Sequence, residues 1–465
     1  MEPPRLLLQA FITLTEGWCS VFTQPRLLVR AQRQALGALL VLGRATLSRI
    51  LWTNGREQCS WSADYFLHSR AKWDAQQLFA PLIKQALHYC RGPLLGVAVD
   101  DTRIRKTGRT IAQAAYHRDP MSPPFHTNLI LGLRFLQASL LLPLHKLTNV
   151  SARAIPIRFE EVSTVKKPAK RADPAAREQY RQDRKRFSLS QRSVASMAAI
   201  RTALDHAGAQ LKTLVIAGDA TFCNRIVLAG LPARTELISR ARKDARLCWP
   251  ARGEGRRIYS AVKFTPEQVR HDLSIPWLSA RLFYGGKRRG VRYKEVAGVL
   301  WQNGARTRPL RLFVIAPTPY RKRKQGRWYY RQPAYLLCTD LLSAAGQLLQ
   351  IYLDRWQIEV NHREEKDTLG VGQAQLRNPK AVPRQPVLVV AAYSALLLAA
   401  LMVFGPLRAA AFAALPRWRR NRRPKRPSLL DLLTLLRKEA SQHPQLLQKL
   451  GILTSAAHLI AAAAA

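Results

Sequence analysis

LLGVAVDD at residues 94–101 and LKTLVIAGDATF at residues 211–222 are the two stretches that decide the fold class. Each is a short apolar run, partly β-branched, that ends in an acidic residue, and such runs are typical of buried strands. An Asp at a strand end most often caps a turn or a helix. If the two strands are neighbours in one sheet, however, their carboxylates converge at its edge. The pattern predicts an α/β fold with acids at one sheet edge.

The chain around these strands contains further elements. Residues 126–147 predict one or two strands, residues 191–207 a helix, and Glu236–Arg240 a short strand. Residues 165–190 are rich in Lys and Arg and are expected to form an exposed helix or linker. YLLCTD at 335–340 predicts another strand, and Ser343 is a candidate cap for a helix that runs to about Leu369.

Residues 241–333 differ from the rest because they alternate in polarity and carry many aromatic side chains. Asn303-Gly304 separates the strand-like runs Val291–Trp301 and Leu310–Ala316, which predicts a hairpin. The segment ends in PYRKRKQGRWYYR at 319–331, where basic and aromatic residues are mixed. We interpret 241–333 as a β-rich insertion whose basic end is either an exposed loop tip or a DNA contact.

The two ends of the chain are predicted to be helical. Residues 1–92 could form a small DNA-binding domain, although no recognition helix can be picked out. The apolar run Pro386–Phe404 is just long enough to span a membrane. It stands alone and contains Tyr393 and Ser394, so a buried core helix is favoured. PRWRRNRRPKRP at 416–427 predicts a basic arm, and the Ser428/Asp431 spacing predicts a capping box after it.

Composition narrows the function classes. The 465 residues include 75 Lys+Arg and 29 Asp+Glu, a net charge of +46. Nucleic-acid phosphates are the obvious partner for this surplus, with an anionic membrane surface or merely solubilising Arg as the alternatives. Hydrophobic residues make up 47%, which excludes a disordered basic tail. The six Cys have no C-x-x-C pairing, and Leu6–Leu14 lacks a cleavage site, so we expect a cytoplasmic protein with reduced thiols and no signal peptide.

The segment YLDRWQIEVNHREEKDTLG, which begins at Tyr352, contains the most informative pattern. At 100° per residue, Tyr352, Arg355, Glu359 and Lys366 fall on one helical stripe about 60° wide, which His362 and Arg363 flank. A buried amphipathic helix would place Leu, Ile and Val on such a stripe. A solvated face with weak i,i+4 ion pairs is one interpretation. A metal-binding Glu beside phosphate-binding cations is the other.

These four residues match Y-x2-R-x3-E-x6-K at every position, and the chain thereby resembles the insertion-sequence DDE transposases that share this signature. VDDT at 99–102 resembles the first catalytic block of that family, and AGDATFCN at 217–224 resembles the second. The resemblance assigns the catalytic and metal-binding roles to Asp101, Asp219 and Glu359, with Asp100 as the neighbouring alternative to Asp101. It covers roughly residues 95–380.

The resemblance implies an RNase H-like catalytic domain interrupted by the β-rich insertion between its fifth strand and the Glu helix. The expected domains are therefore 1–92, helical; 93–240, catalytic; 241–333, insertion; 334–380, catalytic with the Glu helix; and 381–465, helical with a basic arm. The implied activity is DNA nicking and strand transfer with Mg²⁺, for which Mn²⁺ may substitute. Tyr352, Arg355, Arg363 and Lys366 are implied DNA contacts, and Trp328 or Trp301 is a candidate to hold a flipped base.

The implied partners are transposon-end and target DNA, with a homodimer in the DNA complex and no membrane. Three alternatives stay open at this point. The chain could be a nuclease or RNA-processing enzyme of the same fold that does not transpose. It could be a DNA-binding protein derived from a transposase, although all three acids are present. It could also be a basic membrane-associated protein, an interpretation that rests on Pro386–Phe404 alone.

Overall fold

The protein is described from a computed structural model, which covers residues 5–119, 122–123, 125–251, 256–323, 325–422 and 424–453, with the backbone alone at 420–422. Among these residues, a 12-stranded mixed sheet forms the centre of the molecule, in the order β2-β3-β1-β5-β6-β14-β11-β10-β7-β8. Strand β4 pairs with β3, and β9 pairs with β10. The α/β fold class predicted from the sequence is confirmed.

The first half of the sheet surrounds the two strands that decide the fold. β1 is antiparallel to β3, β3 is antiparallel to β2 and β4, and β5 is parallel to both β1 and β6. Residues 126–147 contain one long strand, Leu129–Leu142, and then a short 3-10 helix at Leu144–Lys146. The bounds are β1 (Leu94–Arg105), β2 (Ala115–Arg118), β3 (Leu129–Leu142), β4 (Arg153–Glu161), β5 (Thr213–Gly218) and β6 (Thr235–Arg240).

The β-rich insertion extends this sheet instead of forming a separate body. Strand β14 pairs with β6 on one side and with β11 on the other, which makes the sheet continuous. The predicted hairpin at Asn303-Gly304 joins β10 to β11. The bounds are β7 (Leu247–Pro250), β8 (Tyr259–Phe264), β9 (Leu278–Tyr284), β10 (Lys287–Trp301), β11 (Arg306–Ile315), β12 (Pro319–Arg321), β13 (Trp328–Tyr330) and β14 (Ala334–Cys338).

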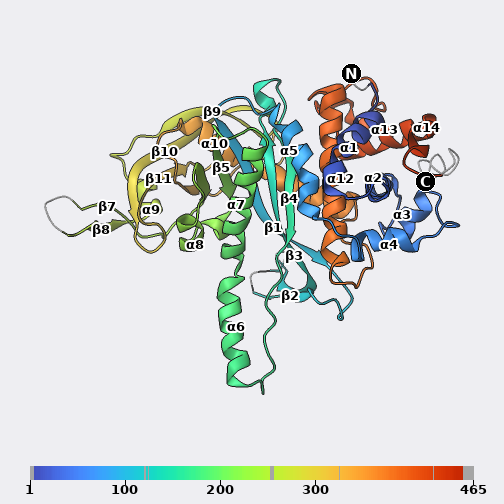
Figure 1. Ribbon diagram of the computed structural model, residues 1–465. Helices are drawn as coiled ribbons and strands as arrows, with labels where there is room; N and C mark the ends of the chain where they lie inside the picture. Colours follow the sequence, from blue (N-terminus) through green and yellow to red (C-terminus); the bar gives the residue numbers. More distant parts are fainter. Residues whose placement is uncertain are drawn as a thin grey trace.

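Helices cover both faces of the sheet, as its buried strands require. On one face, Leu348 of α10 packs in an apolar cluster with Val215 of β5, and Ile358 of α11 packs with Ala98 of β1. On the other face, Met197 of α7 belongs to the same cluster as Leu214 of β5. Helix α7 lies across the central strands in Figure 1. The helices on and beside the sheet are α6 (Pro174–Arg186), α7 (Leu189–His206), α8 (Arg225–Ala229), α9 (Pro266–His271), α10 (Ala345–Asp354) and α11 (Trp356–Arg363).

The two ends of the chain pack together rather than forming two separate regions. Helix α12 contacts α1, α2 and β4, and the backbone N–H of Leu8 donates to Glu439 of α13 at 2.7 Å. Figure 1 shows the resulting helical body on one side of the sheet. Its helices are α1 (Leu7–Glu16), α2 (Pro25–Leu40), α3 (Leu47–Thr53), α4 (Ser62–Ser69), α5 (Ala80–Leu87), α12 (Ala381–Phe404), α13 (Leu429–Gln442) and α14 (Pro444–Gln448).

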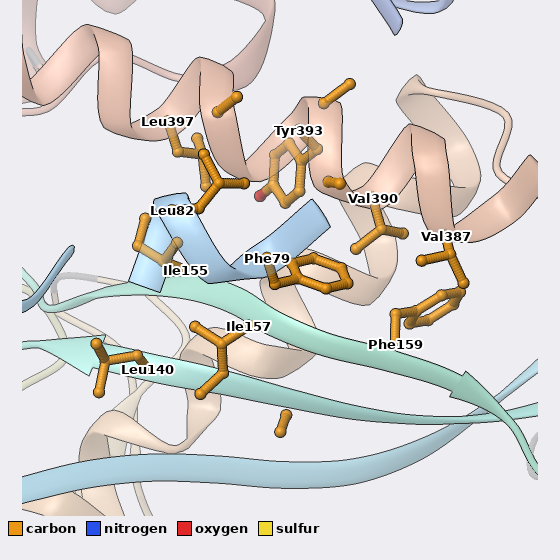
Figure 2. Close-up of a cluster of buried hydrophobic side chains, with 14 of the residues drawn as sticks. Phe79, Leu82, Leu140, Ile155, Ile157, Phe159, Val387, Val390, Tyr393 and Leu397 are labelled. Carbon is orange, nitrogen blue, oxygen red and sulfur yellow. The ribbon is translucent and has the colours of Figure 1, made fainter. Parts of the chain in front are cut away.

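Helix α12 is the apolar run that could have been a membrane span. Among the described helices it is the one long and apolar enough to cross a membrane, yet 83% of its most apolar window is buried inside the protein. Figure 2 shows Val390, Tyr393 and Leu397 of α12 above Ile155 and Ile157 of β4. The prediction of a core helix is confirmed, and this burial fits a soluble protein.

The two helix N-caps predicted from the sequence differ in outcome. Ser428 and Asp431 form the predicted capping box at the start of α13. Ser343 does not cap α10, which begins at Ala345 with Ala344 as its N-cap. The reason is that the Asp340 carboxylate accepts the backbone N–H groups of Leu342 and Ser343, at 2.9 and 2.8 Å, and fixes a turn there.

The predicted basic arm at 416–427 is only partly described, since Arg423 and the side chains of 420–422 lie outside the described residues. Arg417 and Arg419 are exposed. Arg426 is not, because its guanidinium donates to the Ala152 carbonyl at 2.7 Å and to Gln357 at 3.2 Å. The Arg426 guanidinium is thus engaged within the protein, unlike the exposed side chains of Arg417 and Arg419.

Candidate active site

The parallel pairing of β1 and β5 brings the strand-end acids together. Ala98 is the register partner of Ala217, so Asp100 lies level with Asp219, two residues further along each strand. Adjacent strands are about 4.8 Å apart. The convergence of strand-end acids that the sequence predicts therefore involves Asp219 and the first of the two adjacent Asp residues.

Alternation along β1 separates Asp100 from Asp101, because successive side chains point to opposite faces of a strand. Asp100 shares a face with Ala98, which packs against Ile358 of the Glu-bearing helix α11. Asp101 points to the other face, where its carboxylate accepts from Arg134 at 2.8 Å and lies 3.3 Å from Arg103. The side-chain geometry thus favours Asp100, and not the predicted Asp101, as the partner of Asp219 and Glu359.

The electrostatics of Asp100 are those of a crowded acidic site. Burial raises the pKa of the Asp100 carboxyl to about 7, with the negative charges of Asp219 and Asp101 adding to the shift and Arg355 opposing it. Like charges in close proximity disfavour ionisation of one another. A bound cation would relieve this repulsion, so the charge balance of the site is one that a positive ligand stabilises.

Glu359 enters the site from α11 on the stripe predicted from the sequence. The Arg355 guanidinium lies 3.3 Å from Glu359 and 5.8 Å from the Tyr352 ring centroid. Burial raises the pKa of the Glu359 carboxyl, Arg355 opposes the shift, and Asp219 adds to it. The charges of Asp219 and Arg355 thus influence the carboxyls of both Asp100 and Glu359.

The end of the same helix brings His362 and Lys366 to the site. His362 Nδ1 lies 3.9 Å from the Asp100 carboxylate, and burial lowers the pKa of the imidazole to about 3. Residues Glu364–Thr368 form a π-helical turn, a deviation that is often found at functional sites. The buried Glu365, which accepts from Gln137 at 2.9 Å, anchors this turn to β3.

A cavity of about 1270 Å³ opens over these residues. It runs from Asp219 and Glu359 along the second half of β1 to the loop around Gly372 and to Arg44 of the N-terminal helical body. Asp100, Asp219 and Glu359 line the part that we call its acidic end, whereas Asp119 pairs with Arg105 further along β1. Its cations come from several elements and include Arg44, Arg103, Arg105, Lys106, Arg134, Lys366 and Arg377. Such a lining suits an extended polyanion whose reacting group reaches the acidic end.

The acids fit a divalent metal in donor chemistry, since Mg²⁺ and Mn²⁺ prefer carboxylate oxygens. They are not assembled as a ligand cluster, because no three Asp, Glu, His or Cys side chains in the described part of the chain are close enough to hold one ion. Local partners hold them apart. Asp219 caps the turn after β5 by accepting from the Thr221 N–H at 2.8 Å, and Glu359 faces Arg355. One ion held by all three acids would therefore need side-chain positions other than those seen here.

The predicted DNA contacts fall into two groups. Arg355 and Tyr352 lie beside Glu359, and Lys366 lines the cavity. Arg363 is exposed and is not among the described residues that line the cavity. Trp328 lies on the separate two-stranded β12–β13 hairpin, where it is 50% exposed and stacks on Arg321 at 3.9 Å.

Trp301 differs from Trp328, because it is partly buried against the main core. A Cβ added to Gly304 would lie 2.0 Å from the Trp301 ring, so the ring covers the hairpin turn. This packing favours Trp328 over Trp301 as the aromatic side chain available to a nucleic-acid base.

Sequence reasoning missed the cations that line the cavity outside α11. Arg103 was detectable, because it lies two residues beyond Asp101 on the same strand face. Arg134 required the register of β3 on β1, which pairs it with Arg103. Arg44 and Arg377 come from loops far apart in the sequence and carried no local signal. Comparison with known proteins adds no assignment: no protein-family model matches the chain, and a search of curated proteins finds no match either.

Proposed function

We propose that the protein is a DDE transposase that cuts and joins DNA at the acidic end of the cavity. The observation that carries this proposal is that Asp100, Asp219 and Glu359 line one large cavity together with many cations, with Asp100 level with Asp219 on adjacent strands and Arg355 at 3.3 Å from Glu359. Two acids from adjacent parallel strands and one from a helix supply anionic oxygens that the sequence scatters over about 260 residues. Phosphodiester chemistry with two metals needs such a set.

The topology supports an RNase H-like catalytic domain. The strands in the order β4-β3-β1-β5-β6 include an antiparallel half and a parallel half, with the acids on β1 and directly after β5. β6 is followed by the β-rich segment and then by the Glu-bearing helix. This order agrees with the resemblance based on Tyr352, Arg355, Glu359 and Lys366. The proposal differs from that resemblance in taking Asp100 instead of Asp101 as the first acid.

Each residue has a distinct role in the proposed reaction. A divalent ion, Mg²⁺ or Mn²⁺, held by Asp100, Asp219 and Glu359, would supply activation of the attacking hydroxyl and stabilisation of the leaving oxygen. Arg355 stays beside the reacting phosphate and offsets its negative charge. Lys366 and Tyr352 orient the strand end. Asp101 holds Arg103 and Arg134 at 3.3 and 2.8 Å, where they face the approaching backbone.

The remaining parts of the proposal concern partners and location. The net charge of +46 suits DNA of both kinds, transposon ends and target, bound in the cytoplasm of a bacterial cell. Two ends must be held at once for transposition, so a homodimer is the simplest assembly in the DNA complex. The burial of α12 is unfavourable for an alternative membrane role.

The test uses DNA that flanks the coding region, searched first for inverted repeats. Purified protein is incubated with a duplex carrying such an end and with a scrambled duplex, in Mg²⁺, in Mn²⁺ or in EDTA. A transposase is expected to nick the end duplex with either ion and to join it to a second duplex. Nicking of both duplexes without joining would support a non-transposing nuclease instead. DNA binding with no nicking in either ion would indicate a derived DNA-binding protein.

A further inference from the structure

A long basic segment connects β4 to α7 and has no part in the site described above. Residues 163–187, which we call the α6 arm, contain nine basic and three acidic side chains, a net charge of +6. All nine basic residues are exposed. Along Pro174–Arg186, every residue of which the structure describes, none is buried. Figure 1 shows α6 projecting away from the rest of the molecule.

The α6 arm is a helix by its own sequence and not through packing. Asp173 caps its first turn by accepting from the Ala176 N–H at 2.6 Å, and Pro174 occupies the first turn. Arg184, Lys185 and Arg186 lie in its last turn, where the helix dipole favours cations. A helix that is polar on all sides has no apolar face to pack against a core and is stabilised by side-chain pairs along its surface, such as Gln179–Asp183 at 3.1 Å. The exposed basic side chains of α6 are therefore available to an anionic partner.

Both ends of the arm are attached at the acidic edge of the sheet. Leu136 of β3 pairs with Asp101 on one side and with Glu160 of β4 on the other, so β4 ends level with the acids. Two strand spacings, about 10 Å, separate β4 from β1. At the other end, Val194 lies near the start of α7 and packs closely against Gly230. Gly230 ends the short helix α8, which follows the turn that Asp219 caps. The arm therefore leaves and rejoins the fold near the strand ends that carry Asp101 and Asp219.

The reach and the charge of the arm fit duplex DNA. The 13 residues of α6 extend about 20 Å beyond the sheet edge. Arg181 forms an ion pair with Glu178 at 3.2 Å. The basic residues of the arm outnumber its acidic residues by three to one, so ion pairs within the arm cannot neutralise most of its positive charge. Such a surplus along a rod follows a phosphate backbone, which presents one charge for about every 1.7 Å of duplex. Backbone contacts of this kind fix orientation and carry no sequence information.

We propose that the α6 arm binds the phosphate backbone of duplex DNA beside the cleavage site without reading its sequence. The inference rests on the proposed function, because it takes the partner to be the same DNA that the cavity binds. It goes further by assigning a second DNA-binding surface that the catalytic residues do not include.

The test compares two matched pairs of substitutions in the full chain. The arm pair is Arg184→Gln with Lys185→Gln. The control pair is Arg91→Gln with Lys287→Gln, which removes the same charge from exposed residues near the opposite edge of the sheet. Affinity is measured by fluorescence anisotropy in EDTA between 50 and 200 mM salt, on an end-containing duplex and on an unrelated duplex of the same length. Because all four side chains are exposed, equal melting temperatures are expected.

We expect the arm pair to bind both duplexes more weakly by a similar factor, on the order of tenfold, with a log–log salt slope shallower by about 1–2. The control pair should stay within about twofold of wild type. Equal behaviour of the two pairs would overturn the role of the arm. A loss confined to the end-containing duplex would overturn backbone binding without sequence reading. Failure of the wild-type protein to bind either duplex would instead reject the proposed function itself.

Discussion

Asp100 and Asp101 are adjacent in the chain but face different chemical surroundings. Asp100 is grouped with Asp219 and Arg355, whereas Asp101 is neutralised by Arg103 and Arg134. The sequence pattern VDDT contains both acids and cannot separate them. The distinction arises from the period of two along a strand, combined with knowledge of which face of β1 the Glu-bearing helix covers. The alternation of side chains along β1 could be predicted from the sequence, but the face of β1 that α11 covers could not.

Glu365 provides a pH-dependent prediction at the residue scale. Burial raises the pKa of its carboxyl from 4.5 to about 8. The folded-state pKa lies above the unfolded value, so stability present below about pH 4.5 is lost progressively as the pH rises to about 8. Glu365→Gln removes this loss. The variant should gain up to roughly 1.4 kcal/mol relative to wild type for each pH unit in that window.

The measurement is urea unfolding of both proteins at pH 5 and pH 8. The difference in free energy of unfolding should be larger at pH 8, because the penalty accumulates from about pH 4.5 to about pH 8 and only a small part of it is present at pH 5. Glu161→Gln provides a comparison, because burial also raises the pKa of that carboxyl. An advantage for Glu365→Gln that is equal at the two pH values would contradict a protonated Glu365 in the folded state.

Helix α12 is the element that joins the terminal helices to the sheet, which makes its apolar side chains a test of the fold. Leu397 is fully buried, whereas Leu430 in the first turn of α13 is 62% exposed. Leu397→Ala should lower the free energy of unfolding by about 2–5 kcal/mol through lost contacts and a cavity. Leu430→Ala should change it by less than about 0.5 kcal/mol. Calorimetry in detergent-free buffer measures both, and similar values would argue that α12 is not a core helix.

The β12–β13 hairpin makes a prediction about its aromatic side chain. Trp328→Ala should leave the melting temperature unchanged, because half of the side chain is already exposed. It should weaken binding of DNA with an unpaired base at its end by about 1–3 kcal/mol, the usual value of one base stacked on an aromatic ring. Trp301→Ala should lower the melting temperature and leave DNA binding unchanged, because that ring packs on the Gly304 turn. If Trp301→Ala alone weakened binding in a stably folded protein, the roles of the two residues would be exchanged.

The whole molecule carries far more positive charge than its folding requires. With a net charge of +46, duplex affinity should fall steeply as salt rises, because each neutralised phosphate releases counterions. A titration between 50 and 200 mM salt gives the slope of log affinity against log salt. A slope shallower than about −3 would mean that the charge serves mainly for solubility.

The sequence predicts the secondary structure of this chain better than its arrangement. Local periodicity identifies β1, β5, α7, the β10–β11 hairpin and the buried nature of α12. It misses β4, whose Arg153–Glu161 segment is interrupted by Pro156, and it misses the way β14 joins the insertion to β6. It also treats the two ends as separate regions, although α1 packs on α12. These errors concern contacts between residues far apart in the chain, for which a single sequence has no local signal.

The candidate site follows the same division. Tyr352, Arg355 and Glu359 share a helix face, so spacing alone places them together. Asp219 could be placed only by assuming that β1 and β5 are neighbours, which their register confirms. The role of Arg134, and the choice of Asp100 over Asp101, depend on strand pairing and helix position. The chemistry of the site is thus visible in the sequence, while its exact membership depends on the fold.

The most direct test of the account is the nicking rate of four single variants on end-containing duplex in Mg²⁺, alongside a gel shift on the same DNA. Asp100→Asn, Asp219→Asn and Glu359→Gln should each lower the rate by orders of magnitude while DNA binding is retained, because each removes an anionic metal ligand and a charge that repels phosphate. Asp101→Asn should be far milder, since it only loosens Arg103 and Arg134. Near-wild-type nicking by Glu359→Gln would contradict the transposase proposal, and loss of nicking by Asp101→Asn with a mild effect of Asp100→Asn would reverse the assignment of the first acid.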